Sequence, residues 1–229
     1  MPEAPNAVRE LASDPTSRKK FLRQAGGTGV AASLAAFIAA CGGSSSSSTE
    51  SKSTSTPASS TPMASTSGTE QFGKGDLGIA NYALTLEYLE TQFYNDAAAS
   101  GMLKGKLLET AKRFGSEEQE HVDALMALIQ KAGGKPASKP KAKFPLDSAK
   151  SILALATTVE NLDANAYLGQ AGNIKDKQIL AAALSIHSVE ARHAAVLNLA
   201  TKKAPASGAF AKPATADEVL KAVKPFLVS

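Results

Sequence analysis

The chain has 229 residues, of which 43% are apolar and 5% aromatic, with a formal net charge of +4 and one cysteine. One cysteine excludes a disulfide framework and a cysteine-rich zinc site. Five basic and three acidic residues precede position 42, and the remainder is nearly balanced at 20 basic against 18 acidic residues, which argues against a nucleic-acid-binding protein. Ala, Leu, Lys and Glu dominate after residue 75 and predict an all-α domain of ordinary size.

Residues 1–41 have the features of an export signal. Residues 17–23 are rich in basic side chains, and the sixteen residues 25–40 carry no charge. A helix of this length spans about 24 Å, less than the roughly 30 Å hydrocarbon core of a bilayer, so we expect a signal peptide rather than a permanent membrane helix. The pair Arg18-Lys19 resembles a twin-arginine signal with lysine at the second position, and both the twin-arginine and the general secretory route remain open.

The end of this segment, Ile38-Ala39-Ala40-Cys41, resembles a lipoprotein box. In lipoproteins the cysteine is acylated and becomes the new N-terminus. The resemblance therefore implies that Cys41 is a lipid anchor on the outer side of the bacterial cytoplasmic membrane or in the cell envelope. The alternative is an uncleaved or non-lipidated signal with an incidental cysteine. Residues 42–70, with 18 Ser or Thr among 29 positions, predict a disordered linker that holds the next domain clear of the lipid headgroups.

Residues 71–229 predict four helices and a short terminal helix. Asp76 and Asp147 are the expected N-caps of the first and third helices. Gly115 is expected to kink the second helix, because the residues after it resemble a capping box that restarts the helix. A segment rich in Pro and Lys, 135–145, connects the second helix to the third. The predicted ranges are 76–100, 104–132, 147–171, 176–202 and 217–226.

The two halves of this domain repeat one pattern of ionisable residues. In each half a glutamate precedes a tyrosine by seven positions, and a second glutamate, 30 or 31 positions after the first, precedes a histidine by three. The two halves are offset by 72 or 73 positions. The residues are Glu87, Tyr94, Glu118 and His121 in the first half, and Glu160, Tyr167, Glu190 and His193 in the second.

This spacing suits a metal site. Three residues turn a helix by about 300°, so the glutamate and histidine of each pair project from one face and can reach one ion. Seven residues rise about 10.5 Å, so each tyrosine is too far from its own glutamate and is expected to contact a ligand on an antiparallel partner helix. Both Glu-x-x-His pairs lie among apolar residues, which places them on the core side. Four buried glutamates repel one another, and two divalent cations carry the charge that neutralises them.

The constellation resembles that of the ferritin-like four-helix family of di-iron or di-manganese carboxylate proteins. These proteins take one glutamate from each of two helices and Glu-x-x-His from each of the other two. More narrowly, residues 83–90, 166–171 and 190–195, with the tail pattern of 213–226, are similar to bacterial exported ferritin-like proteins and to plant desiccation-related proteins. The resemblance implies an all-α fold, a ferritin-like antiparallel four-helix bundle with a long crossover between helices 2 and 3 and a short C-terminal helix.

The resemblance also implies the ligands of a dinuclear centre. Glu118 and Glu190 are the candidates to bridge two divalent metal ions, with iron preferred to manganese although both accept these ligands. Glu90 and Asp163 lie three positions after the first glutamate of each half, so either these two residues or the two first glutamates can face the centre, and we prefer the first glutamates. Glu117 is expected on a solvated face. The implied ligands are Glu87, Glu118, His121, Glu160, Glu190 and His193, with Tyr94 and Tyr167 as donors beside them.

Three functions remain open at this point. The first is an exported, membrane-tethered protein that binds a dinuclear iron or manganese centre and oxidises Fe(II) with oxygen or peroxide. The second is metal storage without turnover, and the third is a metal-free structural or stress-protection bundle at the cell envelope, in which the former ligands make hydrogen bonds. The expected partners are the membrane through Cys41, metal ions and a second copy in a homodimer, with no nucleic acid. No nucleophilic triad, phosphate loop or nucleotide fingerprint occurs in the sequence.

Overall fold

The computed structural model describes residues 68–206 and 208–228. The predicted signal segment 1–41, with Cys41, and nearly all of the predicted linker 42–70 lie outside the described residues. Within the described part of the chain, no helix combines the length and the apolar character needed to cross a bilayer.

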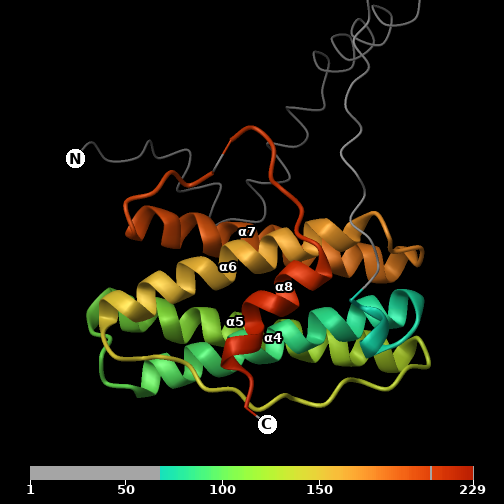
Figure 1. The fold of residues 1–229 in the computed structure, drawn as a ribbon, viewed down its shortest axis with the longest axis horizontal. Helices are drawn as coiled ribbons and strands as arrows, with labels where there is room; N and C mark the ends of the chain where they lie inside the picture. The colour runs from blue at the N-terminus through green and yellow to red at the C-terminus, as the bar shows by residue number, and fades with distance from the viewer. Residues whose placement is uncertain (1–67, 207, 229) are drawn as a thin grey trace, which may run out of the picture. The chain divides into compact units, whose positions relative to one another are not determined.

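Four long helices pack in two pairs, α4 along α5 and α6 along α7 (Figure 1). A long connection leads from the first pair to the second. The predicted four-helix bundle with a crossover between its second and third helices is therefore confirmed. The bounds of the long helices are α4 Gly75–Ala99, α5 Gly105–Lys131, α6 Ala149–Ala171 and α7 Lys177–Ala200. The short elements are η1 Glu70–Phe72, α8 Ala216–Val223 and η2 Lys224–Phe226.

Both predicted N-caps are wrong. Asp76 lies inside the first turn of α4, and its carboxylate accepts hydrogen bonds from the backbone N–H groups of Lys175, at 3.0 Å, and Asp176, at 2.5 Å. The side chain therefore ties the start of α4 to the loop before α7. At α6 the cap is Ser148 rather than Asp147, because the Ser148 hydroxyl accepts a hydrogen bond from the backbone N–H of Ser151 at 3.1 Å.

α5 runs as one continuous helix through Gly115, so the helix does not end and restart there as the resemblance to a capping box predicted. Gly115 has a different role. A Cβ added there would lie 3.0 Å from the Cβ of Tyr94 on α4, closer than ordinary van der Waals contact. The glycine therefore allows α4 and α5 to approach each other beside the centre of the bundle.

Two apolar clusters fill the interior on either side of a polar layer. On α5 one cluster ends at Phe114 and the other begins at Val122. On α7 the corresponding limits are Leu197 and Ile186. The residues between these limits include the most buried charged side chains of the described chain. Such side chains are costly to bury unless they are paired or bind an ion, which makes the polar layer the candidate site.

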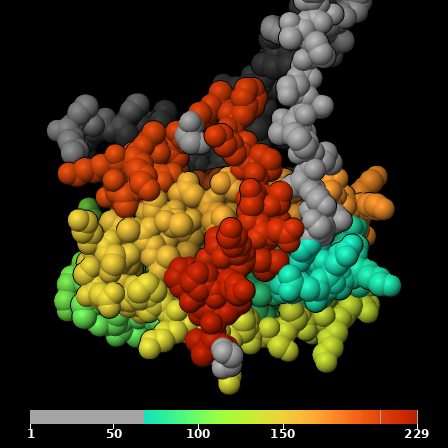
Figure 2. Space-filling view, viewed as in Figure 1, coloured from blue at the N-terminus to red at the C-terminus, as the bar shows by residue number. Residues whose placement is uncertain are grey.

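The C-terminal segment covers the seam between α4 and α6. In Figure 1 α8 crosses in front of these two helices, and Figure 2 shows its side chains on that face. The segment before α8 docks on α6, where the N–H of Ala214 donates to the carbonyl of Asn165 at 2.9 Å. A Cβ at Gly169 would lie only 1.9 Å from the Ala214 carbonyl oxygen, so this contact requires glycine. After η2, the tail pairs with the crossover through an antiparallel bridge between Leu227 and Ala142.

Candidate metal centre

The polar layer brings together the six side chains that the sequence pattern selects. Their four glutamates have no exposed surface, and His193 is 2% exposed. Each of the four long helices contributes at its middle turns, so the apolar clusters above and below hold the side chains in place. The contributions are Glu87 from α4, Glu118 and His121 from α5, Glu160 from α6, and Glu190 and His193 from α7.

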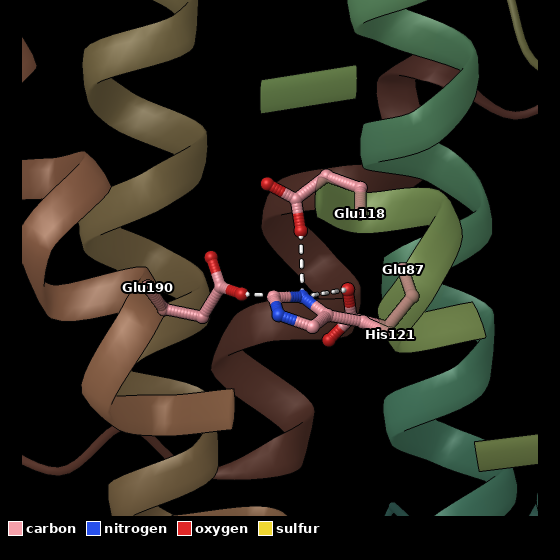
Figure 3. A group of neighbouring side chains, drawn as sticks. All are labelled: Glu87, Glu118, His121 and Glu190. Atoms are coloured by element: carbon pink, nitrogen blue, oxygen red, sulfur yellow. Dashed lines mark hydrogen bonds and ion pairs between the residues drawn. The ribbon is translucent and has the colours of Figure 1, made fainter. Parts of the chain in front are cut away.

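The first group surrounds the imidazole of His121. Its Nδ1 atom lies 2.9 Å from an oxygen of Glu118 and 2.9 Å from an oxygen of Glu190. An oxygen of Glu87 is 3.3 Å away. Figure 3 shows these three carboxylates approaching the ring from different helices.

The second group surrounds His193 in the same way. Its Nδ1 atom lies 3.0 Å from an oxygen of Glu118, 3.4 Å from Glu160 and 3.7 Å from Glu190. In each of the two groups, one oxygen or nitrogen atom per residue lies within 4.8 Å of all the others. Glu118 and Glu190 belong to both groups, and Glu87 and Glu160 to one each. The two shared carboxylates therefore lie between the two histidines.

Hydrogen bonding among these residues does not satisfy them. A histidine nitrogen carries at most one hydrogen, whereas each Nδ1 faces three carboxylates. Several buried atoms, including both oxygens of Glu190, one oxygen each of Glu118 and Glu160, and Nδ1 of His193, have no aligned hydrogen-bond partner in the described chain. Oxygen and nitrogen donors that converge on a common centre without pairing are what a cation needs. The residues present therefore fit metal ions.

Two tyrosines connect the halves of the bundle. The hydroxyl of Tyr167 on α6 donates to Glu87 on α4 at 2.5 Å, and that of Tyr94 on α4 donates to Glu160 on α6. Each tyrosine thus contacts the glutamate of the opposite pair, the arrangement that the seven-residue spacing predicts. Each hydroxyl occupies one oxygen of its glutamate, and the second oxygen faces a histidine.

Glu117 was expected on a solvated face, and its side chain is indeed 32% exposed, but it also contacts the polar layer. Its carboxylate accepts a hydrogen bond from Nε2 of His193 at 2.8 Å and pairs with Arg113 at 3.0 Å. The side chain is long enough to reach from α5 across to α7. The ring of Phe114 also stacks on His193, with the centroids 3.7 Å apart. The signal in the sequence was an asymmetry, because the position before the ligand is Glu117 in one half and Val189 in the other.

The sequence left open whether Glu87 and Glu160 or Glu90 and Asp163 face the centre of the bundle, and in the structure both pairs are buried there. Glu87 and Glu160 are the residues that contact the histidines. Glu90 and Asp163 nevertheless also face the interior, with 1% and 3% of their surfaces exposed. An oxygen of each lies within 4.8 Å of an oxygen of Glu87. The polar layer thus contains six carboxylates rather than four.

The environment changes the pKa values of several residues in the cluster. Burial raises the pKa of Glu87 to about 8, against the opposing contact with His121. Burial raises the pKa of Glu190 as well, but its close contacts with the imidazoles of His121 and His193 outweigh this effect and lower the pKa to about 2. Burial lowers the pKa of His193, yet its carboxylate neighbours outweigh that effect and raise the pKa to about 12. The pKa of His121 is raised for the same reason. Without an ion, the imidazoles and Glu87 therefore hold protons near neutral pH.

Comparisons with known proteins agree with this architecture. The family model of the ferritin-like domain matches residues 75–203, a range that contains all four long helices and all six residues of the two groups. The crystal structure of a conserved hypothetical protein from Mycobacterium tuberculosis is similar in fold, with a TM-score of 0.50 and 16% sequence identity. The match covers 55% of this chain and 96% of that chain. A search of curated proteins found no match.

Proposed function

The chain belongs to the ferritin-like domain family, and from this premise we propose that it binds two divalent metal ions in the polar layer between its four long helices. One observation carries the proposal. Each histidine Nδ1 lies among three buried carboxylates and can share a hydrogen with only one of them. Two ions would neutralise the four glutamates of these groups and use the atoms that hydrogen bonds leave without a partner.

The proposed ligands divide into two half-sites. His121 and Glu87 hold one ion, His193 and Glu160 hold the other, and Glu118 and Glu190 contribute to both. Iron is the preferred metal, with manganese as the alternative, because both accept carboxylate and imidazole ligands. When bound, a pair of Fe(II) ions supplies the two electrons that reduce oxygen to hydrogen peroxide, or hydrogen peroxide to water, with two protons taken up in either reaction.

The neighbouring side chains prepare the ligands. The hydroxyls of Tyr94 and Tyr167 hold one oxygen of Glu160 and of Glu87, which orients the other oxygen toward the half-site. Glu117 accepts the Nε2–H of His193, so Nδ1 of that ring is the atom left for the ion. The two apolar clusters limit the access of water from the ends of the bundle.

The proposal is tested by metal content. Elemental analysis of the full chain from its native cells should give at least two divalent metal ions per chain, and anaerobic loading with Fe(II) followed by oxygen or peroxide should oxidise the iron. Because Glu118 and Glu190 are shared, Glu118→Ala or Glu190→Ala should remove both ions of the dinuclear centre. Two or more ions per chain in the Glu118→Ala, Glu190→Ala double variant would contradict the proposal. Metal without oxidation would favour storage, and a metal-free native protein would favour the structural role.

We further propose that the domain is exported and tethered by a lipid on Cys41. The support comes from the sequence of residues 1–41, which combines a basic segment, an uncharged segment and a lipoprotein-like box. Two acyl chains hold a protein stably on a membrane, whereas one binds marginally. Cys41→Ala should release the protein from the membrane fraction or block its processing, and an unchanged fraction and mature mass would contradict the tether.

A further inference from the structure

The proposed dinuclear centre leaves two interior carboxylates without a role. Glu90 on α4 and Asp163 on α6 lie about one helical turn after Glu87 and Glu160. They lie on the side of the polar layer that α8 covers, away from α5 and α7. They are 1% and 3% exposed, and none of their four carboxylate oxygens has a hydrogen-bond partner in the described chain. A buried carboxylate that is neither paired nor hydrogen-bonded is costly, so the pair requires an explanation.

The charges of the layer do not balance with two ions alone. Two divalent ions neutralise four of the six buried carboxylates, so the negative charges of the other two carboxylates remain. Without an ion, burial and then the charges of neighbouring carboxylates raise the pKa of both Glu90 and Asp163, which keeps them protonated. The residual charge can therefore be met by protons or by a further cation.

The geometry favours a further cation. One oxygen each from Glu87, Glu90 and Asp163 lies within 4.8 Å of the other two. Oxygen ligands of one ion, each about 2.1 to 2.4 Å from it, are separated by at most about twice that distance, so these three atoms can share an ion. Glu90 and Asp163 also border a small apolar cavity of about 20 Å³ beneath Val219 and Val223 of α8, so this helix covers the pair on the side of the α4–α6 seam.

We propose that Glu87, Glu90 and Asp163 hold a third cation, between α4 and α6 and under α8. Its protein ligands are three carboxylates with no imidazole, so it prefers a hard, oxygen-seeking ion such as Mn(II), Mg(II) or Ca(II) over zinc or copper. The position shares Glu87 with the dinuclear centre and in that respect rests on the proposed function. The third position differs from the dinuclear centre because its ligands include no imidazole and because α8 covers it.

Mn(II) alone is the probe, because it is hard and stable in air. The full chain is dialysed to equilibrium against Mn(II), and the bound metal is measured by elemental analysis. The test variant is Glu90→Gln with Asp163→Asn, which keeps the shapes of the side chains and removes two charges. The matched control is Glu120→Gln with Asp123→Asn, the same chemical change at two exposed positions of α5. Thermal unfolding of the ion-free proteins checks that each variant is folded.

We expect three Mn(II) ions per chain in the parent and in the control, and two in the test variant. Two ions in the parent, or three in the test variant, would overturn the third position and leave the dinuclear centre intact. Fewer than two ions in the test variant would assign Glu90 and Asp163 to the dinuclear centre itself and would also overturn the third position. The parent could also bind a single ion that is lost in the Glu90→Gln, Asp163→Asn variant and kept in the Glu118→Ala variant. That result would refute the dinuclear proposal and support the third position.

Discussion

His121 and His193 occupy equivalent places in the two halves of the bundle but have different neighbours. Nε2 of His193 is held by Glu117, and its ring is stacked on Phe114. The equivalent positions in the other half are Val189 and Ile186, which offer neither a hydrogen-bond acceptor nor an aromatic ring. The side chain of His121 is 12% exposed, whereas that of His193 is 3% exposed. The two half-sites are therefore chemically unequal.

This inequality leads to the first prediction. Glu117→Val introduces valine, the residue that the other half has at the equivalent position 189. The change removes the carboxylate that accepts the hydrogen bond from Nε2 of His193. Loss of such a partner typically weakens metal affinity about 10- to 100-fold, so the Mn(II) ion of the His193 half-site should bind more weakly by this factor in a calorimetric titration. Glu120→Val, on an exposed position of the same helix, should bind as the parent does. Equal affinities in all three proteins would show that Glu117 does not position His193.

At the scale of elements, the helices were largely predictable and their caps were not. The predicted ranges agree with the observed helix bounds to within a few residues, because apolar periodicity and flanking glycines mark where each helix runs. Asp76 has the residue type of a cap, but it bonds to a loop 99 and 100 residues later, and such a partner cannot be read from local sequence. The residues of the polar layer were predictable because their spacing repeats. Glu117 was missed because it has no counterpart in the repeat.

The docking of α8 yields the second prediction. In the middle of a helix, alanine is more favourable than glycine by about 1 kcal/mol, so Gly169→Ala should stabilise α6 if propensity alone decided. The added Cβ would, however, lie 1.9 Å from the carbonyl oxygen of Ala214 and must displace the segment that leads to α8. We expect a net loss of about 1 to 3 kcal/mol in the free energy of unfolding, measured with urea.

The matched control for this prediction is Gly208→Ala. A Cβ at Gly208 meets no atom within 4 Å, so the change should be nearly neutral. A Gly169→Ala protein at least as stable as the parent would show that the Ala214 segment yields without cost and that α8 is not anchored by this contact.

For the molecule as a whole, the ion-free protein should lose stability as the pH rises, which is the third prediction. The pKa of Glu87 is about 8 when folded against 4.5 ordinarily, so between these values the folded state keeps a proton that the unfolded chain releases. The pKa values of Glu90, Glu160 and Asp163 are raised in the same direction. Above pH 6.5 His193, with a pKa of about 12, adds to the loss. The lowered pKa of Glu190 acts in the opposite sense, but below pH 4.5.

The measurement is urea unfolding of the chelator-treated full chain at pH 5, 7 and 9. The free energy of unfolding should be greatest at pH 5 and should decrease at each step. Saturating Mn(II) should weaken or reverse this trend, because ligands must lose their protons to bind an ion and because an ion that binds the folded state stabilises it. Greater stability of the ion-free protein at pH 9 than at pH 5 would contradict the assigned protonation of the polar layer.

The place of α8 after the four long helices has a consequence for the order of events during synthesis. Chains are made from the N-terminus, so α4 to α7 leave the ribosome before α8, the helix that covers the seam above Glu90 and Asp163. The side of the layer between α5 and α7 is complete once the fourth long helix has packed. The side between α4 and α6 stays open until α8 has been made and Leu227 pairs with Ala142 of the crossover. The newly made bundle thus passes through a stage with one open flank, and this flank is the one lined by carboxylates alone.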